Sequence, residues 1–241
     1  MPAGFNTIAQ LSTRDVTTME IDPADFNHIL LGSHSAWANG QVPGVMETKD
    51  GGQTWTLHPG DASWGTGSLA IGFLYNPSLG IGNSNTWIVM TDGHGSWRTI
   101  DAGATWTKVS DYGIPHGGSA LYYSATGAIY AGSTPYPLIS TDNGVTWQQM
   151  TNGTNYSYYY SIGGDGTKIY TQVSYASQPG QNFPGLNPYL TANEGTTGPW
   201  TPYQNGAQLF DNGPFLMKFD SVNRIMYSAN WRVGFWALKV L

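Results

Sequence analysis

An eight-residue pattern, Ser/Thr-x-Asp-x-Gly-x-Thr-Trp, occurs three times in this chain and once more in a degenerate form. The full copies are TKDGGQTW at 48–55, TIDAGATW at 99–106 and STDNGVTW at 140–147, and the degenerate copy is TANEG at 191–195, followed by Trp200. Their first residues are 51, 41 and 51 positions apart. Such spacing is typical of an architecture built from repeated units that each contain one copy of the motif.

Each position of the motif has a role in a tight β-hairpin turn. The aspartate carboxylate can accept hydrogen bonds from backbone N–H groups of the turn that follows it. The glycine adopts a positive φ that residues with a side chain resist, and the Thr-Trp pair begins the next strand with a large aromatic ring. The motif therefore predicts a hairpin turn that is held together by its own residues.

The pattern resembles the Asp-box, also called the bacterial neuraminidase repeat, and three nearly perfect copies make the resemblance specific. It covers about residues 14–205 and implies a β-propeller. Asp-boxes occur in sialidases, in two-lobed xyloglucanases and in sortilin-type receptors, where they lie on the outer rim, away from the active site. The resemblance therefore implies a structural role for Asp50, Asp101 and Asp142, and it indicates a fold rather than an activity.

Composition and charge exclude several classes of function. The chain has 241 residues, which suits one all-β domain, and we expect residues 1–241 to form a single propeller. Its net charge is −6 and its nine Lys and Arg residues are scattered, so the basic surface that nucleic acids require is missing. No apolar run reaches the length of a membrane span, and without cysteine neither disulfides nor thiolate chemistry is available.

Short apolar runs separated by turn residues predict five blades of antiparallel strands, with four strands in each of the first four blades. The predicted blades are about 14–58, 68–110, 118–150, 158–204 and 214–241. The last blade has only three strands, whereas residues 5–11 form a strand without a neighbour. Pairing that strand with the last blade would close the ring and remove an exposed sheet edge. The alternative is a fragment of a larger propeller, but the matched spare strand favours a complete five-bladed ring.

The position of the boxes divides the loops between the two faces of the ring. The boxes occupy the turns between third and fourth strands, so the loops between second and third strands and the links between blades gather on the opposite face, where propeller ligands usually bind. Aromatic, carboxylate and imidazole side chains there suit a carbohydrate, whose apolar faces stack on rings while its hydroxyls are hydrogen-bonded. We expect substrate contacts from Trp37, His58, Trp64, Asp92, His94, Tyr136, Tyr156, Tyr158, Trp231 and Arg232. On the box side, His28 is expected to be a turn residue.

Two kinds of glycan cleavage fit the residues of this face. Hydrolysis requires two carboxylates, for which Asp61 and Asp211 are the leading candidates. A polysaccharide lyase instead uses a base such as histidine, and His116 and His34 could take that role. His116 immediately precedes a predicted inner strand, which directs it towards the ring axis. A site built on three histidines lacks a recognisable ligand spacing, and we expect neither a metal nor another cofactor.

Three other classes are less favoured. Sialidases need three arginines that grip the substrate carboxylate and an Arg-Ile-Pro-like motif; this chain has four arginines and no such motif, and Arg98 and Arg224 fall outside the predicted ligand face. A five-bladed lectin would repeat similar pockets between blades, whereas the loops at 34–43, 92–96 and 174–187 differ in length and content. A protein-interaction scaffold would need an exposed patch that the sequence alone does not reveal.

The sequence therefore predicts a monomeric, five-bladed Asp-box propeller that acts on, or binds, a polysaccharide or oligosaccharide through one axial pocket opposite the boxes. We expect an extracellular or cell-surface protein, although no leader is visible in this sequence. Unequal loops favour a glycan-degrading enzyme over a lectin, and the choice between hydrolase and lyase stays open.

Overall fold

The computed structural model describes the chain except for residues 1–14, 35–36, 38–42, 117–120, 155–156, 175–186, 204–208, 211–212, 231–233 and 241. The described residues form five antiparallel sheets of three or four strands that follow one another along the chain, besides one short two-stranded pair. They also include a 3-10 turn, η1 (Ala62–Trp64). Within this described part, no helix is long and apolar enough to cross a membrane.

The sheets are the blades of a propeller, and in each the strands lie in chain order. The first blade contains β1 (Val16–Asp22), β2 (Asp25–Ser33), β3 (Gly44–Thr48) and β4 (Thr56–Pro59). The second contains β5 (Leu69–Phe73), β6 (Trp87–Thr91), β7 (Gly95–Thr99) and β8 (Thr107–Ser110). The third contains β9 (Leu121–Tyr123), β10 (Ile129–Ala131), β11 (Leu138–Ser140) and β12 (Gln148–Gln149).

The last two blades differ slightly from this plan. The fourth contains β13 (Gly163–Gly164), β14 (Lys168–Thr171), β16 (Leu190–Asn193) and β17 (Thr201–Pro202), and the fifth contains β19 (Pro214–Asp220), β20 (Ile225–Asn230) and β21 (Gly234–Lys239). A separate short pair joins β15 (Asn187–Pro188) to β18 (Leu209–Phe210). The fifth blade thus has three strands among the described residues. The predicted closing strand 5–11 lies outside them and stays a prediction.

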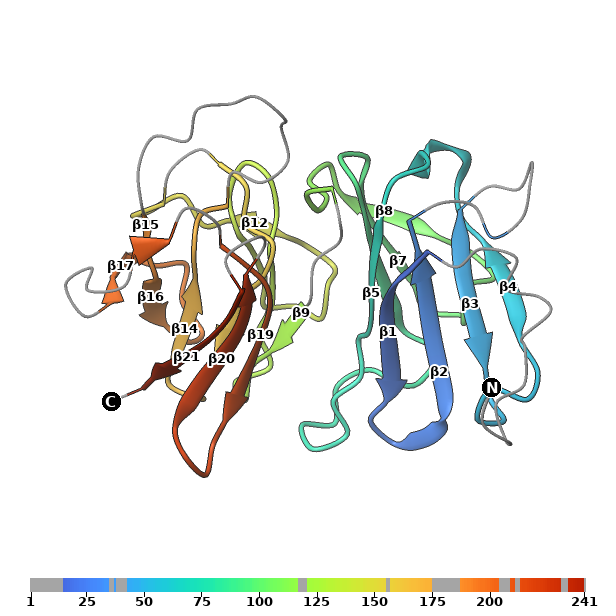
Figure 1. Ribbon diagram of the computed structural model, residues 1–241. Helices are drawn as coiled ribbons and strands as arrows, with labels where there is room; N and C mark the ends of the chain where they lie inside the picture. Colours follow the sequence, from blue (N-terminus) through green and yellow to red (C-terminus); the bar gives the residue numbers. More distant parts are fainter. Residues whose placement is uncertain are drawn as a thin grey trace.

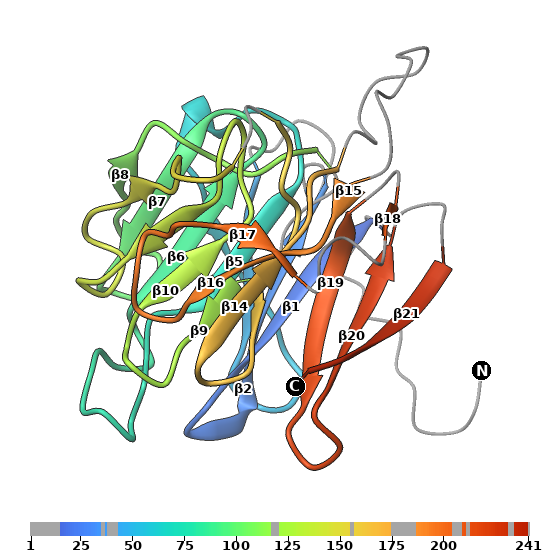
Figure 2. The same cartoon turned by 90° about the vertical axis from the view of Figure 1, so that its left-hand side faces the viewer.

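The first strands of the blades lie next to one another around the ring axis. Strand β1 contacts β5, β5 contacts β9, and β13 contacts β19. In Figure 1 the first two blades lie on the right and the later ones on the left, and Figure 2 shows the same succession from the side. The predicted all-β, five-bladed propeller is confirmed.

The core lies between neighbouring blades, because its clusters join buried residues of one sheet to those of the next. Every residue of β6 is buried, for example, and its sequence WIVMT is a continuous apolar run rather than an alternating one. Between the first two blades, Leu30 and Val45 pack with Leu69 and Trp87. This packing holds the ends of the inner strands in place, and these ends carry both sites described below.

The Asp-boxes have the predicted self-contained geometry. In the first box the Thr54 N–H and hydroxyl donate to the two carboxylate oxygens of Asp50, at 2.9 and 2.7 Å. The Gly52 N–H donates at 2.9 Å to the hydroxyl of the first motif residue. The same bonds recur around Asp101 and Asp142. Hydrogen bonds from the turn lower the pKa of Asp50 and Asp101 to about 2.

The degenerate copy at 191–195 uses different contacts. The Tyr122 hydroxyl donates to Glu194 Oε1 at 3.0 Å, and the Gly195 N–H donates to the Tyr130 hydroxyl at 2.6 Å. Both tyrosines belong to the third blade, on β9 and β10. The turn of the fourth blade is therefore bonded to its neighbour at the positions where the three full boxes use the hydrogen bonds of their own aspartate.

Replacing Asp142 with alanine is expected to lower the free energy of unfolding by about 1 kcal/mol, because the turn loses hydrogen bonds to a charged group at an exposed position. Denaturant unfolding measures the change, with Val145→Ala, at an exposed position of the same turn, as the control. The folded Asp142→Ala variant should keep its ligand binding. A selective loss of binding in a variant of normal stability would contradict the structural role.

Candidate functional site

Two carboxylates and two histidines from separate parts of the chain form a cluster on the face opposite the boxes. Asp15 immediately precedes β1, and His34 immediately follows β2. Asp92 immediately follows β6, and His116 lies in the link that leads to β9. All four positions lie on the side of the ring that the strand register assigns to the box-free face. The sequence analysis placed His34, Asp92 and His116 on one face, and the structure brings them together.

The four side chains form a continuous hydrogen-bonded row. His34 Nδ1 lies 2.8 Å from Asp15 Oδ2, and His116 Nδ1 lies 2.7 Å from Asp92 Oδ2. Between the rings, the two Nε2 atoms are 3.3 Å apart, and the ring planes are inclined at 77°. The side chain of His34 is 33% exposed and that of His116 is 61% exposed, so a ligand can reach both rings.

The positions of the carboxylates determine where the protons lie. An ionised carboxylate only accepts hydrogen bonds, so the Nδ1 atom of each ring must donate to its own aspartate. The two Nε2 atoms then face each other, and one proton between them satisfies both, since one donates and the other accepts. His34 and His116 therefore form a pair that can release or take up one proton, with Asp15 and Asp92 orienting the rings.

The same Nε2 spacing also fits two ligands of one metal ion. A tetrahedral zinc ion with Zn–N bonds of about 2.0–2.1 Å places two ligand nitrogens about 3.4 Å apart, and zinc-bound histidines commonly donate their other ring N–H to a carboxylate. However, no group of three His, Cys, Asp or Glu side chains that could hold an ion occurs among the described residues. The pair thus supplies two of the three or four protein ligands that zinc sites use.

The predicted aromatic contacts Trp37 and Trp64 are core residues, which corrects the expectation that their rings stack on a sugar. Trp37 is 1% exposed and its indole N–H donates to the Gly44 carbonyl at 2.8 Å, while Trp64 is fully buried against Trp97 and Trp106. Both were assigned to long surface loops. Each ring instead turns inwards to cover the apolar end of a blade, because its burial stabilises the fold more than exposure in a loop would.

Three other predicted residues have local partners and no hydrogen bond to His34 or His116. His58 lies in β4 and its Nε2 is 2.9 Å from Glu47 Oε2. Asp61 accepts hydrogen bonds from the Ser63 N–H and hydroxyl, at 2.9 and 2.7 Å, and so caps η1. His94 is exposed, and its ring lies against Gly65.

Two of the six remaining predicted site residues belong to the described part of the chain. Tyr136 and Tyr158 are both half-buried. Tyr136 lies in the loop between β10 and β11 of the third blade, and Tyr158 lies in the link between the third and fourth blades. The other four lie outside the described residues and stay predictions: Tyr156, Asp211, Trp231 and Arg232.

Sequence reasoning missed a buried ionic network on the box side, between the first two blades. His28 is a strand residue that is 3% exposed, so the expectation of a simple turn histidine is wrong. Its Nδ1 lies 2.9 Å from Asp22 Oδ2 and its Nε2 lies 2.8 Å from Glu47 Oε1. Glu47 also contacts His58 and, at 3.1 Å, Lys49 Nζ. These hydrogen bonds outweigh desolvation and lower the pKa of Glu47 to about 2.

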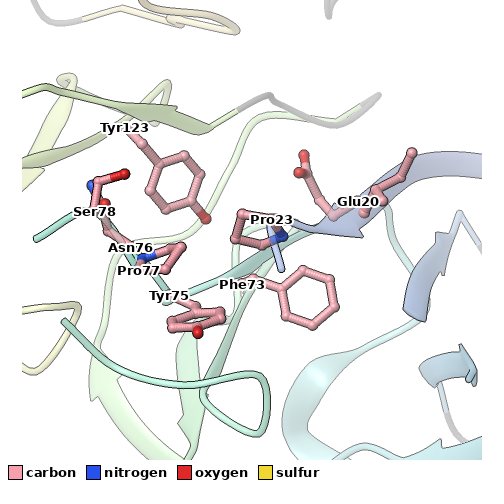
Figure 3. A pocket seen from close by; sticks show the side chains of 9 residues that line it. Glu20, Pro23, Phe73, Tyr75, Asn76, Pro77, Ser78 and Tyr123 are labelled. Carbon is pink, nitrogen blue, oxygen red and sulfur yellow. The ribbon is translucent and has the colours of Figure 1, made fainter. Parts of the chain in front are cut away.

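The sequence analysis also missed a pocket of about 370 Å³ at the box-side ends of β1 and β5. Figure 3 shows it between Glu20 of β1, Phe73 of β5, Tyr75 just beyond β5, and Tyr123 of β9. Its signal in the sequence is Glu20, an acidic residue inside an inner strand. Sequence reasoning placed the ligand on the opposite face, so this residue received no role.

Part of the third blade is similar in sequence to a known repeat family. Residues 138–149, which include the box at Asp142, match the family model for the BNR/Asp-box repeat. This segment is a BNR/Asp-box repeat. The other two full Asp-boxes have the same hydrogen bonds, so the structure extends the similarity to the first and second blades. No curated protein matches the sequence.

Solved structures share the propeller fold at low sequence identity. The GH74 xyloglucanase from Xanthomonas campestris has a TM-score of 0.66 and 15% identity, covering 93% of this chain and 37% of that one. PorZ, a surface component of the type-IX secretion system of Porphyromonas gingivalis, has a TM-score of 0.60 and 12% identity, with 95% and 34% covered. YCF48 bound to the D1 peptide has a TM-score of 0.55 and 16% identity, with 95% and 80% covered.

These similarities establish the fold. The chain spans less than two fifths of the xyloglucanase, and identities of this size leave the activity open. One similar structure is a glycoside hydrolase, one is a secretion-system component and one is bound to a peptide.

Proposed function

We propose that this Asp-box propeller binds and cleaves a polysaccharide or oligosaccharide on its box-free face, with the His34–His116 pair as the proton-transfer centre. The proposal depends on one observation, the row Asp15–His34–His116–Asp92 with its two exposed rings 3.3 Å apart. General acid–base catalysis needs a group that exchanges a proton within reach of the substrate, and this pair is such a group. The fold shared with a GH74 xyloglucanase is compatible with a glycan substrate.

Elimination fits the described residues better than hydrolysis. A lyase base removes the proton next to a uronate carboxyl group, and an acid protonates the departing glycosidic oxygen; the paired histidines supply both functions. Hydrolysis needs two carboxylates on either side of the bond. Here Asp15 and Asp92 are each bonded to a histidine, and Asp61 caps η1. The substrate class that follows is a uronate-containing glycan, and we place the protein outside the cell as a monomer.

The test is to incubate the protein with plant and microbial polysaccharides and to follow both unsaturated ends, by ultraviolet absorbance, and reducing ends. Unsaturated ends should appear with the wild-type protein, and His116→Ala and His34→Ala should each lower the rate by about 10²–10⁴-fold. The control is Val222→Ala, at an exposed position between β19 and β20 on the box side, which should retain full activity.

Four outcomes would count against the proposal. Reducing ends without unsaturation would assign hydrolysis, and loss of activity with EDTA followed by recovery with zinc would assign the histidine pair to a metal. Binding of glycans on an array without turnover, and equally well in both histidine variants, would show that the pair is not part of the binding site. Binding of peptides alone would favour a scaffold, a reading that the peptide-bound YCF48 structure supports.

A further inference from the structure

The pocket on the box side is separate from the proposed glycan site, which lies at the opposite end of the inner strands. It has a volume of about 370 Å³ and is lined by one carboxyl group, three aromatic rings and two prolines, with Asn76 and Ser78 at its rim. In Figure 3 the Glu20 carboxyl and the Tyr123 hydroxyl both point into this space, and the rings of Phe73 and Tyr75 lie along its wall. Residues of three inner strands, β1, β5 and β9, or of the turns that follow them, therefore line the same pocket.

Two polar groups in this pocket lack partners within the described part of the chain. The half-buried Glu20 carboxyl makes no hydrogen bond and no ion pair there. The Tyr123 hydroxyl is buried without a hydrogen-bond partner. Burial raises the pKa of Glu20 to about 7, and the charge of Lys218 on β19 offsets only part of this effect. Buried polar groups are normally hydrogen-bonded, so each unpaired group calls for an explanation, such as a missing ligand.

A ligand of this pocket must complement a carboxylate, a hydroxyl oxygen and aromatic faces at once. We propose that the pocket binds the ammonium group of a small organic amine, which donates hydrogen bonds to Glu20 and to Tyr123 Oη and lies against the aromatic rings. An ammonium group has three donors, pairs with a carboxylate and is attracted to the faces of aromatic rings. The net charge of −6 also favours the approach of a cation.

Other ligand classes satisfy the pocket less completely. An anion would be repelled by ionised Glu20. A neutral alcohol could hydrogen-bond to the same oxygens, but it would leave the buried carboxylate without a counter-charge, which is costly in an apolar environment. The volume is large enough for an amine with a six-membered ring, and cyclohexylammonium and cyclohexanol form a matched pair of probes that differ in charge but hardly in shape.

The affinity for the amine should depend on pH through Glu20. The other titratable groups around it are Tyr123 on β9, Tyr75 beyond β5 and Lys218 on β19; Asp22, at the end of β1, is bonded to His28. Alkylammonium groups titrate near the pKa of lysine, about 10.4, so they stay charged at neutral pH. Ionisation of Glu20 should therefore strengthen binding about tenfold between pH 6 and pH 8.

The experiment is calorimetric or NMR titration of the full chain with cyclohexylammonium and with cyclohexanol at pH 8. The wild-type protein should bind the ammonium at least about tenfold more tightly than the alcohol, and Glu20→Gln should abolish this preference. Tyr123→Phe, which keeps the ring, should weaken binding of the ammonium a few-fold. Unchanged melting temperatures show that both variants are folded.

Equal affinity for the two probes, or a preference that survives in Glu20→Gln, would overturn the proposal. So would failure of the wild-type protein to bind the ammonium at pH 8. The His116→Ala variant should bind the amine normally, because its substitution is at the opposite end of the inner strands. The glycan assay and the amine titration can therefore fail independently of each other.

Discussion

Replacing Glu47 with glutamine is expected to lower the free energy of unfolding by about 3 kcal/mol, because removal of one partner leaves the other members of a buried ionic network uncompensated. The Glu47 side chain is 6% exposed and contacts His28, His58 and Lys49 at 2.8, 2.9 and 3.1 Å. Glutamine keeps the size of the side chain but not its charge. The loss should therefore be electrostatic, with little change in packing.

Urea unfolding at neutral pH measures this effect, and Asp111→Asn is the matched control. Asp111 is paired with Lys108 at 2.7 Å, but its side chain is 88% exposed, so removal of its charge should leave the stability almost unchanged. The pH dependence gives a second measure. The pKa of Glu47 is lowered to about 2 in the folded protein, so its contribution is present above the unfolded value, near 4.5, and is lost as the pH falls towards 2.

In Glu47→Gln, the stability difference from the wild type should accordingly shrink as the pH is lowered from about 5 towards 2. Equal stability of the two proteins at neutral pH would show that the network makes no net contribution. A difference that does not change with pH would instead assign the effect to packing.

Replacing Asp92 with asparagine is expected to lower kcat of the proposed elimination by about 10²–10³-fold with little change in KM. The Asp92 carboxylate accepts from His116 Nδ1 at 2.7 Å and so keeps the proton on that nitrogen. Asparagine can present an N–H group to the ring instead, which favours the tautomer with its proton on Nε2. His116 then holds its proton on Nε2, so this exposed nitrogen can no longer act as the base.

The conservative variant Asp92→Glu should recover part of the rate, and the pH profile of kcat should shift in Asp92→Asn. A merely structural role for Asp92 would lower stability and leave the pH profile unchanged. Loss of substrate affinity with normal kcat would make Asp92 a binding residue, as the sequence analysis expected, and would contradict its role in orienting His116.

The architecture could be predicted because the Asp-box is a contiguous signal. The hydrogen bonds that the Asp50 carboxylate accepts in the turn come from residues within the motif, so the local sequence largely determines the turn. Once the boxes mark the turns between third and fourth strands, the antiparallel alternation assigns every other loop to a face. This assignment placed His34, Asp92 and His116 correctly on one face before any distance was known.

Burial and pairing could not be predicted in the same way, because they depend on contacts between distant residues. In the sequence, Trp37 and Trp64 lie in predicted surface loops, where their rings would be free to stack on a ligand. The structure instead packs both rings into the core. His34 and His116 are separated by 82 positions, and their contact depends on how two blades pack. Glu20 is one acidic residue in a strand, and its unusual environment arises from β5 and β9.

The degenerate box of the fourth blade has a consequence for the order of folding. In each full box, the hydrogen bonds to the aspartate and to the hydroxyl of the first motif residue span four positions at most, so this part of the turn can form as soon as its own residues are present. The fourth turn instead needs Tyr122 and Tyr130, which are 72 and 65 positions away from their partners Glu194 and Gly195. Contacts of such long range are slow to form, so the third blade must be in place before this turn is stable. During synthesis from the N-terminus, the third blade is the template on which the fourth is completed.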